Sequence, residues 1–330
     1  MAEKPVLYGG QAVIEGVMFG GRYTQVTAIR RKNGQIETYE ILKNEHPALS
    51  FLKKIPFIRG IVALVESSAS GAKHLQFASE KYEQDMDEDD ESTASASEDS
   101  SSSSWNVGMM ISVTILGILS FIVGKIIFTA VPAFLASVLF DRFTKNLIIQ
   151  NLIEGGIKTL LLLTYLWIIS QTPIIKRLFQ YHGAEHKVIS TYELGQELTV
   201  ENVQKQSTLH YRCGSSFIIL TVIVGVILYS FFHYDTVWDR IWNRILLIPV
   251  VIGLSYELLR FTNAVRNVPV LGLLGYPGLW LQKLTTKEPS DDQVEVAIAA
   301  FNRMLELDAE IAQSKSTEQA ATAHLSSSTS

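Results

Sequence analysis

Apolar segments of membrane-spanning length constrain the fold of this chain more than any other feature. A helix needs roughly 20 apolar residues to cross a hydrocarbon core of about 30 Å. Residues 107–128, 147–170 and 216–232 meet that requirement, the last together with its flanks. Residues 245–259 are shorter and contain Pro249, so we expect a fourth helix packed inside a bundle. The sequence therefore predicts a mainly α-helical protein, a polytopic membrane bundle of about four spans, or five.

Basic residues predict the orientation of such a bundle, because cytoplasmic connections carry an excess of lysine and arginine. The connection at residues 171–215 holds more of them than the other two connections: Lys176, Arg177, Lys187, Lys205 and Arg212. We therefore expect this connection and both termini to lie in the cytoplasm, with a multi-pass bundle in the cell's inner membrane.

The N-terminal part, residues 1–79, is expected to be cytoplasmic and to contain a small β element. Strand formers at residues 23–31 and 35–41 flank Lys32-Asn33-Gly34, which is a strong hairpin signal. The glycine-rich residues 9–21 match neither the dinucleotide nor the phosphate-loop spacing. We interpret these glycines as tight turns against neighbouring backbone.

Polar segments divide the remainder of the chain. Residues 80–104 are acidic and serine-rich, with too little apolar content to fold, and predict a disordered linker into the bundle at residues 105–264. Residues 265–312 predict a cytoplasmic C-terminal segment with an amphipathic helix. Its apolar positions recur at helical spacing: Val294, Ile298, Phe301 and Leu305. Residues 313–330 are rich in serine, threonine and alanine and predict a disordered tail.

Charge and cysteine content limit the expected partners. The net charge of −5 comes largely from the acidic run, and no basic face suited to nucleic acid is evident. The lipid bilayer is the expected partner, and the cytoplasmic parts offer surfaces for protein partners; the oligomeric state stays open. Cys213 is the only cysteine, so the chain has no intrachain disulfide framework, which fits a reducing compartment.

The connection at residues 171–215 also gathers most of the residues suited to chemistry. It holds three of the seven histidines and the cysteine: His182, His186, His210 and Cys213. His182 and His186 stand four apart on one helical face, where both can bind one divalent metal. With Glu185 they spell H-x-x-E-H, the inverted zincin order, in which the carboxylate activates a water at the metal. We predict a divalent metal here, zinc first, with Glu185 as general base.

Several residues compete to complete this site. His210 and Cys213 stand three apart, Glu193 continues the helical face of the histidines, and Glu257 lies near the cytoplasmic end of the fourth span. Four protein ligands including the thiolate would make a closed, structural site. Glu257 needs a partner or a function because a carboxylate inside the membrane is costly, and Arg260 is the simplest partner.

The leading hypothesis is a metal-dependent enzyme of hydrolase type with its site at the cytoplasmic face. A non-enzymatic membrane scaffold or regulatory protein is the main alternative. A small transporter using Glu154, Lys158 and Glu257 is less favoured, because four spans are few for alternating access and no inverted repeat is visible. A redox role for Cys213 ranks last, since the chain has no second cysteine to resolve an oxidised thiol.

Six motifs match one known family. They occupy residues 9–18, 181–187, 192–199, 212–214, 255–257 and 277–286. On these motifs the chain resembles the YqhQ-like family of bacterial membrane proteins over nearly its whole length. The resemblance implies a metal-dependent membrane protein whose activity is not assigned.

Overall fold

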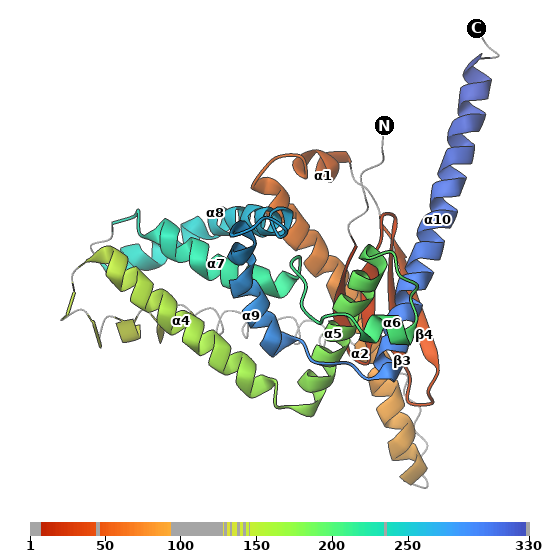
Figure 1. Ribbon diagram of the computed structural model, residues 1–330, viewed down its shortest axis with the longest axis horizontal. Helices are drawn as coiled ribbons and strands as arrows, with labels where there is room; N and C mark the ends of the chain where they lie inside the picture. The colour runs from red at the N-terminus through yellow and green to blue at the C-terminus, as the bar shows by residue number, and fades with distance from the viewer. Residues whose placement is uncertain are drawn as a thin grey trace, which may run out of the picture.

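The computed structural model describes residues 8–43, 47–93, 146–233 and 236–327, with short pieces between residues 128 and 144. Figure 1 shows a small sheet covered by helices, beside a group of long helices that extends away from it. The first predicted span, residues 107–128, lies outside the described residues except for Phe128. The structure is mainly helical with an N-terminal antiparallel sheet, as the sequence predicts.

The sheet has four antiparallel strands in the order β1-β2-β3-β4. The strands are β1 (Gly9–Val13), β2 (Gly16–Gly20), β3 (Thr24–Arg30) and β4 (Ile36–Leu42). The predicted hairpin is confirmed as β3 and β4, and Gly34 takes the positive φ of +85° in their turn.

The interpretation of the glycine-rich residues 9–21 as turns alone is wrong, because these residues form β1 and β2. A Cβ at Gly16 would lie 2.1 Å from the carbonyl oxygen of Ala28, and one at Gly10 would lie 2.5 Å from that of Met18. Glycine therefore stands where the neighbouring strand approaches too closely for a side chain. Because glycine has no side chain, this stretch also lacks the alternation of apolar and polar side chains that identifies a strand in a sequence.

Helices cover both faces of the sheet. On one face α5 (Pro173–Glu193) and α10 (Asp291–Ser327) enclose the main apolar core with β2 and β3, in which Phe19 and Phe301 are fully buried. On the other face α2 (Ile58–Thr93) packs Ala78 against Val13 and Ile29. The predicted amphipathic helix is thus the part of α10 that seals the core.

α10 is also joined to the sheet by hydrogen bonds to the turn between β2 and β3. The Asp308 carboxylate accepts from the backbone N–H of Tyr23 at 2.9 Å and from the Thr24 hydroxyl at 2.8 Å. The N–H of Arg22 donates to the same carboxylate. This charge-assisted set fixes the register of the helix along the sheet.

Two segments predicted to be disordered are partly helical. α2 continues to Thr93, through the first residues of the predicted linker at 80–104, and α10 continues to Ser327, through most of the predicted tail at 313–330. Both extensions are rich in Glu, Gln, Lys or Ala, which favour helix over coil, so a helix that packs elsewhere in the protein can continue through them. The low apolar content of these segments indicated only that they lack a core of their own.

Among the described residues, three apolar helices stand beside the sheet unit: α4 (Leu147–Ile169), α7 (Gly214–Tyr229) and α8 (Val237–Ala264). By length and composition, α4 and α8 can each cross a membrane, through Ile148–Ile169 and Trp242–Ala264. Only 11% and 22% of their most apolar windows are buried, unlike the core helix of a soluble protein. α7 is apolar but has 16 residues. Within the described residues two helices meet the length requirement, so the four-span count stays a prediction.

An ion pair joins two of these helices. The Glu154 carboxylate on α4 accepts from the Arg244 guanidinium on α8, and both side chains are about nine-tenths buried. Glu154 is one of the charged residues on which the transporter hypothesis depends, and the structure pairs it with an arginine of a neighbouring helix. A buried carboxylate needs such a charge, since an unpaired one is strongly destabilising.

The other helices whose bounds the structure describes are short or lie at the ends of the apolar group. They are α1 (Pro47–Leu52), α6 (Val200–Gln204), the 3₁₀ helix η1 (Leu271–Gly275) and α9 (Tyr276–Thr285). The elements α6, η1 and α9 belong to the segments that surround the histidines.

His74 on α2 predicts a pH dependence of stability. It is fully buried, hydrogen-bonded through Nδ1 to the Thr27 hydroxyl at 2.7 Å, and burial, with a smaller effect of Lys73, lowers its pKa from 6.5 to about 4. The unfolded chain therefore binds a proton that the folded chain rejects as the pH falls from about 6.5 to about 4. We expect about 3 kcal/mol of stability to be lost across that window.

The measurement is denaturant unfolding in detergent, followed by circular dichroism from pH 7.5 to 4, for the parent and for His74→Gln. Gln keeps a hydrogen-bonding group and does not titrate, so its stability should depend less steeply on pH. Identical slopes for the two proteins would contradict the assignment to His74.

Candidate metal centre

α5 carries the H-x-x-E-H motif on a face that turns toward the rest of the protein. The helix starts at Pro173, whose ring suits the first turn, and the positive φ of Gly195, +67°, follows its end. His182 and His186 are one turn apart, and their ring centroids are separated by 4.5 Å. The predicted pairing of the two imidazoles on one helical face is therefore what the structure shows.

Gly183 explains why the motif contains a glycine despite the cost of glycine in a helix. A Cβ at this position would lie 2.1 Å from the carbonyl oxygen of Lys287. The N–H of Lys287 donates to the Phe179 carbonyl at 2.9 Å, so residues 285–287 cross directly over α5. Only a residue without a side chain permits this crossing.

Cys213 joins the two histidines from a distant point in the sequence. One ligand atom from each of His182, His186 and Cys213 lies within 4.8 Å of the other two. The Cys213 Sγ is 3.2 Å from His182 Nε2. Cys213 is also the N-cap of α7, where Sγ accepts from the Ser215 N–H at 3.4 Å. The first turn of an apolar helix thus positions the sulfur.

Both imidazoles are held by backbone carbonyls through their other nitrogen. His182 Nδ1 donates to the Thr285 carbonyl at 2.7 Å, and His186 Nδ1 donates to the Thr208 carbonyl at 2.5 Å. A carbonyl only accepts, so in a neutral ring the proton is on Nδ1 and the lone pair is on Nε2. Such anchoring is typical of metal-binding histidines, whose orientation it fixes.

The residues present fit a metal ion. His186 Nε2 is buried and has no hydrogen-bond partner among the described residues, which is costly unless the nitrogen binds something. Burial lowers the pKa of His186, which keeps the ring neutral as a ligand must be. Two imidazoles and a thiol are donors that zinc favours.

Glu185 lies beside this group and is not a member of it. The side chain is buried and accepts a hydrogen bond from the backbone N–H of Gly10 on β1. Burial raises the pKa of Glu185 to about 7, against the opposing effects of His182 and Gly10. A Cβ at Gly10 would lie 3.0 Å from the Glu185 carboxyl carbon. The glycine-rich strand therefore makes room for this carboxyl group.

His210 lies next to the group, with its ring centroid 5.7 Å from that of His186. Its Nε2 is 3.7 Å from the Glu193 carboxylate, which also pairs with Arg212. The nearby His210 imidazole, followed by the charges of Arg212 and Arg266, lowers the pKa of Glu193. Glu193 thus acts as a partner of His210 and Arg212, and neither Glu193 nor His210 belongs to the three-residue ligand group.

Glu257 is placed elsewhere. Its carboxylate binds the Arg59 guanidinium through two hydrogen bonds and accepts from the Phe57 N–H at 3.2 Å. Arg59, and not the predicted Arg260, is therefore the hydrogen-bonded partner of Glu257. The reason is that the start of α2 packs against α8, where Gly60 lies against the Tyr256 side chain. Glu257 is not among the candidate metal ligands of the described residues.

Sequence reasoning did not assign roles to Thr208, Gln282 and Thr285. The buried Gln282 amide accepts from the His210 N–H at 2.8 Å and donates to the His210 carbonyl at 2.7 Å, which holds the loop before Cys213. Gln282 and Thr285 lie in the motif at residues 277–286, which was the available signal. Thr208 acts through its backbone carbonyl oxygen. Every residue has this group, so the sequence contained no signal for the role of Thr208.

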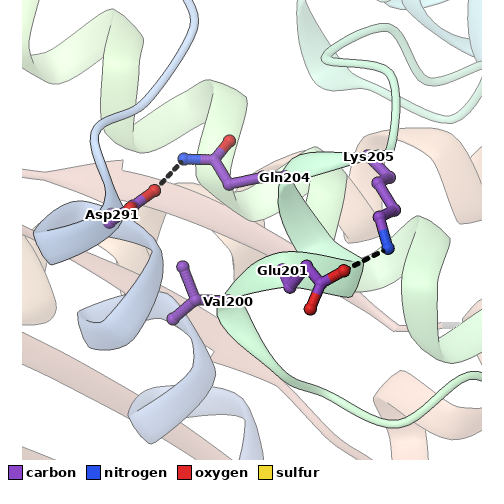
Figure 2. Close-up of a pocket in the computed structure, with 5 residues that line it drawn as sticks. All are labelled: Val200, Glu201, Gln204, Lys205 and Asp291. Carbon is purple, nitrogen blue, oxygen red and sulfur yellow. Dashed lines mark hydrogen bonds and ion pairs between the residues drawn. The ribbon is translucent and has the colours of Figure 1, made fainter.

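A pocket at the surface is separate from this centre. Figure 2 shows it between α6 and the start of α10, lined by Val200, Glu201, Gln204, Lys205 and Asp291. Lys205 pairs with Glu201 at 2.7 Å, and Gln204 donates to Asp291 at 2.9 Å. Its polar side chains are satisfied by one another, so the pocket offers no reactive group.

Comparison with known proteins relates the chain to proteins without an assigned activity. The family described as "Protein of unknown function (DUF1385)" matches residues 55–307. The protein of Bacillus subtilis (strain 168) called "Uncharacterized protein YqhQ" is 53% identical over 305 residues, covering 92% of this chain and 94% of that protein. No solved structure matches the chain.

The crossing at Gly183 predicts an unusual response to a conservative change. Gly183→Ala should destabilise the protein by about 1–3 kcal/mol, because the new methyl group overlaps the Lys287 carbonyl, although alanine is the better helix former. The measurement is thermal or denaturant unfolding in detergent. Gly214→Ala is the matched control, since a Cβ there meets nothing within 4 Å. Equal stability of Gly183→Ala and the parent would mean that residues 285–287 move aside freely.

Proposed function

The chain belongs to the DUF1385 family, whose function is unknown, and from its geometry we propose that it is a membrane-bound, metal-dependent enzyme of hydrolase type. The observation that carries the proposal is the convergence of three ligand atoms on His182, His186 and Cys213. Both imidazoles are anchored so that their unprotonated nitrogens face the sulfur. Histidines that only fill a packed core do not require their unprotonated nitrogens to converge on a thiol.

In this proposal His182, His186 and Cys213 hold a divalent metal, with zinc as the best match to two nitrogens and one sulfur. Three protein ligands are the number found in catalytic zinc sites, whereas structural sites use four. Such a metal would supply Lewis acidity to a substrate oxygen and to water. The closed four-ligand alternative would need His210 or Glu257, and neither belongs to the group.

Glu185 is the proposed general base. It adjoins His186 in the sequence and is buried beside β1, where the Gly10 N–H donates to the carboxyl group. A buried, oriented carboxyl group can take a proton from water and return it to a leaving group. Glu193 contacts both His210 and Arg212 at the edge of the centre, and these contacts support the loop that carries Cys213.

The membrane part of the proposal rests on the exposed apolar helices. α4 and α8 are long enough to cross a bilayer and bury little of their apolar surface within the protein. We propose that these two helices cross the inner membrane, with the shorter α7 packed between them and the sheet unit on the cytoplasmic side. The sheet unit and the metal centre then share the compartment in which a single cysteine stays reduced.

Metal content tests the central claim. Elemental analysis of the purified, detergent-solubilised protein should give about one transition-metal ion per chain, as expected for a single site, and the double variant His182→Ala/His186→Ala should lose it. His233→Ala is the control, because this exposed histidine lies beyond the far end of α7. Absence of metal from the parent after reloading with zinc would overturn the proposal and favour a non-enzymatic scaffold.

A second variant separates catalysis from metal binding. Glu185→Gln should keep the metal and lower the hydrolytic rate by roughly 10²–10⁴-fold, the usual contribution of a general base. The assay uses the metal-loaded parent against a panel of ester, amide and phosphodiester substrates. Glu197→Gln, at an exposed position, is the matched control. Full activity in Glu185→Gln would remove this residue from the mechanism, and no hydrolysis by the parent would argue against a hydrolase.

A further inference from the structure

The connection between α8 and α10 exposes an unusual amount of apolar surface. Val270 is 77% exposed, Leu273 is 53% exposed and Trp280 is 64% exposed. Other large apolar side chains of the same stretch are also exposed: Val268, Leu271, Leu274 and Tyr276. Sequence reasoning had placed this stretch in the cytoplasmic segment 265–312. So many exposed apolar side chains in one short stretch would be a liability in water, so this surface, the apolar patch, indicates a partner.

The patch is continuous with the helices proposed to cross the membrane. η1 packs against α8, and α9 packs against both α7 and α4. In Figure 1, α9 runs across these apolar helices and not alongside the sheet unit. A surface that adjoins lipid-facing helices and is itself apolar most simply faces the same lipid.

Charge around the patch suits a bilayer surface. Residues 258–287 contain no acidic residue and four basic ones: Arg260, Arg266, Lys283 and Lys287. Basic residues that flank an apolar segment pair with anionic headgroups, while tryptophan and tyrosine favour the boundary between headgroups and acyl chains. Trp280 and Tyr276 provide that aromatic pair.

The backbone at the tip of the connection is set for a sharp turn. Val270 has a φ of +69°, a conformation that a β-branched residue rarely adopts. Gly272 lies where a Cβ would be 2.7 Å from the Arg266 carbonyl oxygen, so the chain folds back tightly on itself. The turn presents Val270 and Leu273 outward and not into the protein.

The other side of the same element holds the metal centre. Gly275 lies against the Tyr211 ring, and Gly278 lies against Ser216, where in each case a Cβ would approach to 2.5 Å. Further along α9, Gln282 fixes the backbone of His210 and the Thr285 carbonyl accepts from His182. One short helix therefore links the apolar patch to the ligand group.

We propose that residues 266–280 insert into the cytoplasmic leaflet of the lipid bilayer as a re-entrant element, with Val270 and Leu273 among the acyl chains and Trp280 at the boundary between acyl chains and headgroups. This rests on the proposed membrane location of α4 and α8. The inserted element holds the metal centre at the level of the lipid headgroups. An amphiphile with a polar group at the centre and an apolar tail in the leaflet is then the class of substrate that the site would take.

Tryptophan quenching by brominated lipid tests the insertion in the full-length protein. The chain has five tryptophans: Trp105, Trp167, Trp238, Trp242 and Trp280. Three single-tryptophan proteins are needed, with every other tryptophan replaced by Phe. The first keeps Trp280, the second keeps Trp167 on α4, and the third carries Leu42→Trp on the exposed end of β4. Each is reconstituted into vesicles of phosphatidylcholine and phosphatidylglycerol with brominated or plain acyl chains, and circular dichroism checks its fold.

The expected result is that bromination removes most of the emission of Trp280 and of Trp167 and leaves that of Leu42→Trp unchanged. Quenching of Trp167 with an unquenched Trp280 would overturn the insertion and leave the membrane-spanning proposal intact. If neither is quenched, both proposals fail. Quenching of Trp280 alone would support contact of this element with lipid while contradicting a membrane location for α4.

Discussion

The crossing of residues 285–287 over α5 at Gly183 is the contact on which the rest of the site depends. It brings the end of α9 to the middle of α5, where the Thr285 carbonyl accepts from His182. That carbonyl belongs to the last turn of α9 and has no partner within its own helix. One hydrogen bond therefore satisfies a helix end and orients a candidate ligand.

From this crossing the chain continues into α10, which closes the apolar core over the sheet. The same helix α5 thus faces the core through Tyr181, Ala184 and Val188 and the candidate metal centre through His182 and His186. Any change in how α5 sits on the sheet moves the ligands with it. The packing of the core therefore positions the two imidazoles, as a preorganised site requires.

Electrostatic partners join the sheet unit to the apolar helices. Arg59, at the start of α2, binds Glu257 on α8, and the same long helix α2 reaches the sheet through Ala78 and His74. On the other side, Cys213 both caps the apolar helix α7 and belongs to the ligand group. The centre lies where the sheet unit and the apolar helices meet, as the proposed chemistry at a membrane surface would require.

The sequence by itself determined the features that depend on neighbours along the chain. The β3–β4 hairpin, the apolar segments of α4 and α8, and the pairing of His182 with His186 follow from local turn chemistry and from periods of 3.6 or 2 residues. Only the tertiary structure decided that Cys213 joins the histidines while Glu257 binds Arg59. It also decided that Thr208 and Thr285 hold the imidazoles. The physical reason is that a backbone carbonyl is common to all residues, and the partner of a charge is chosen by how distant helices pack, which no local pattern encodes.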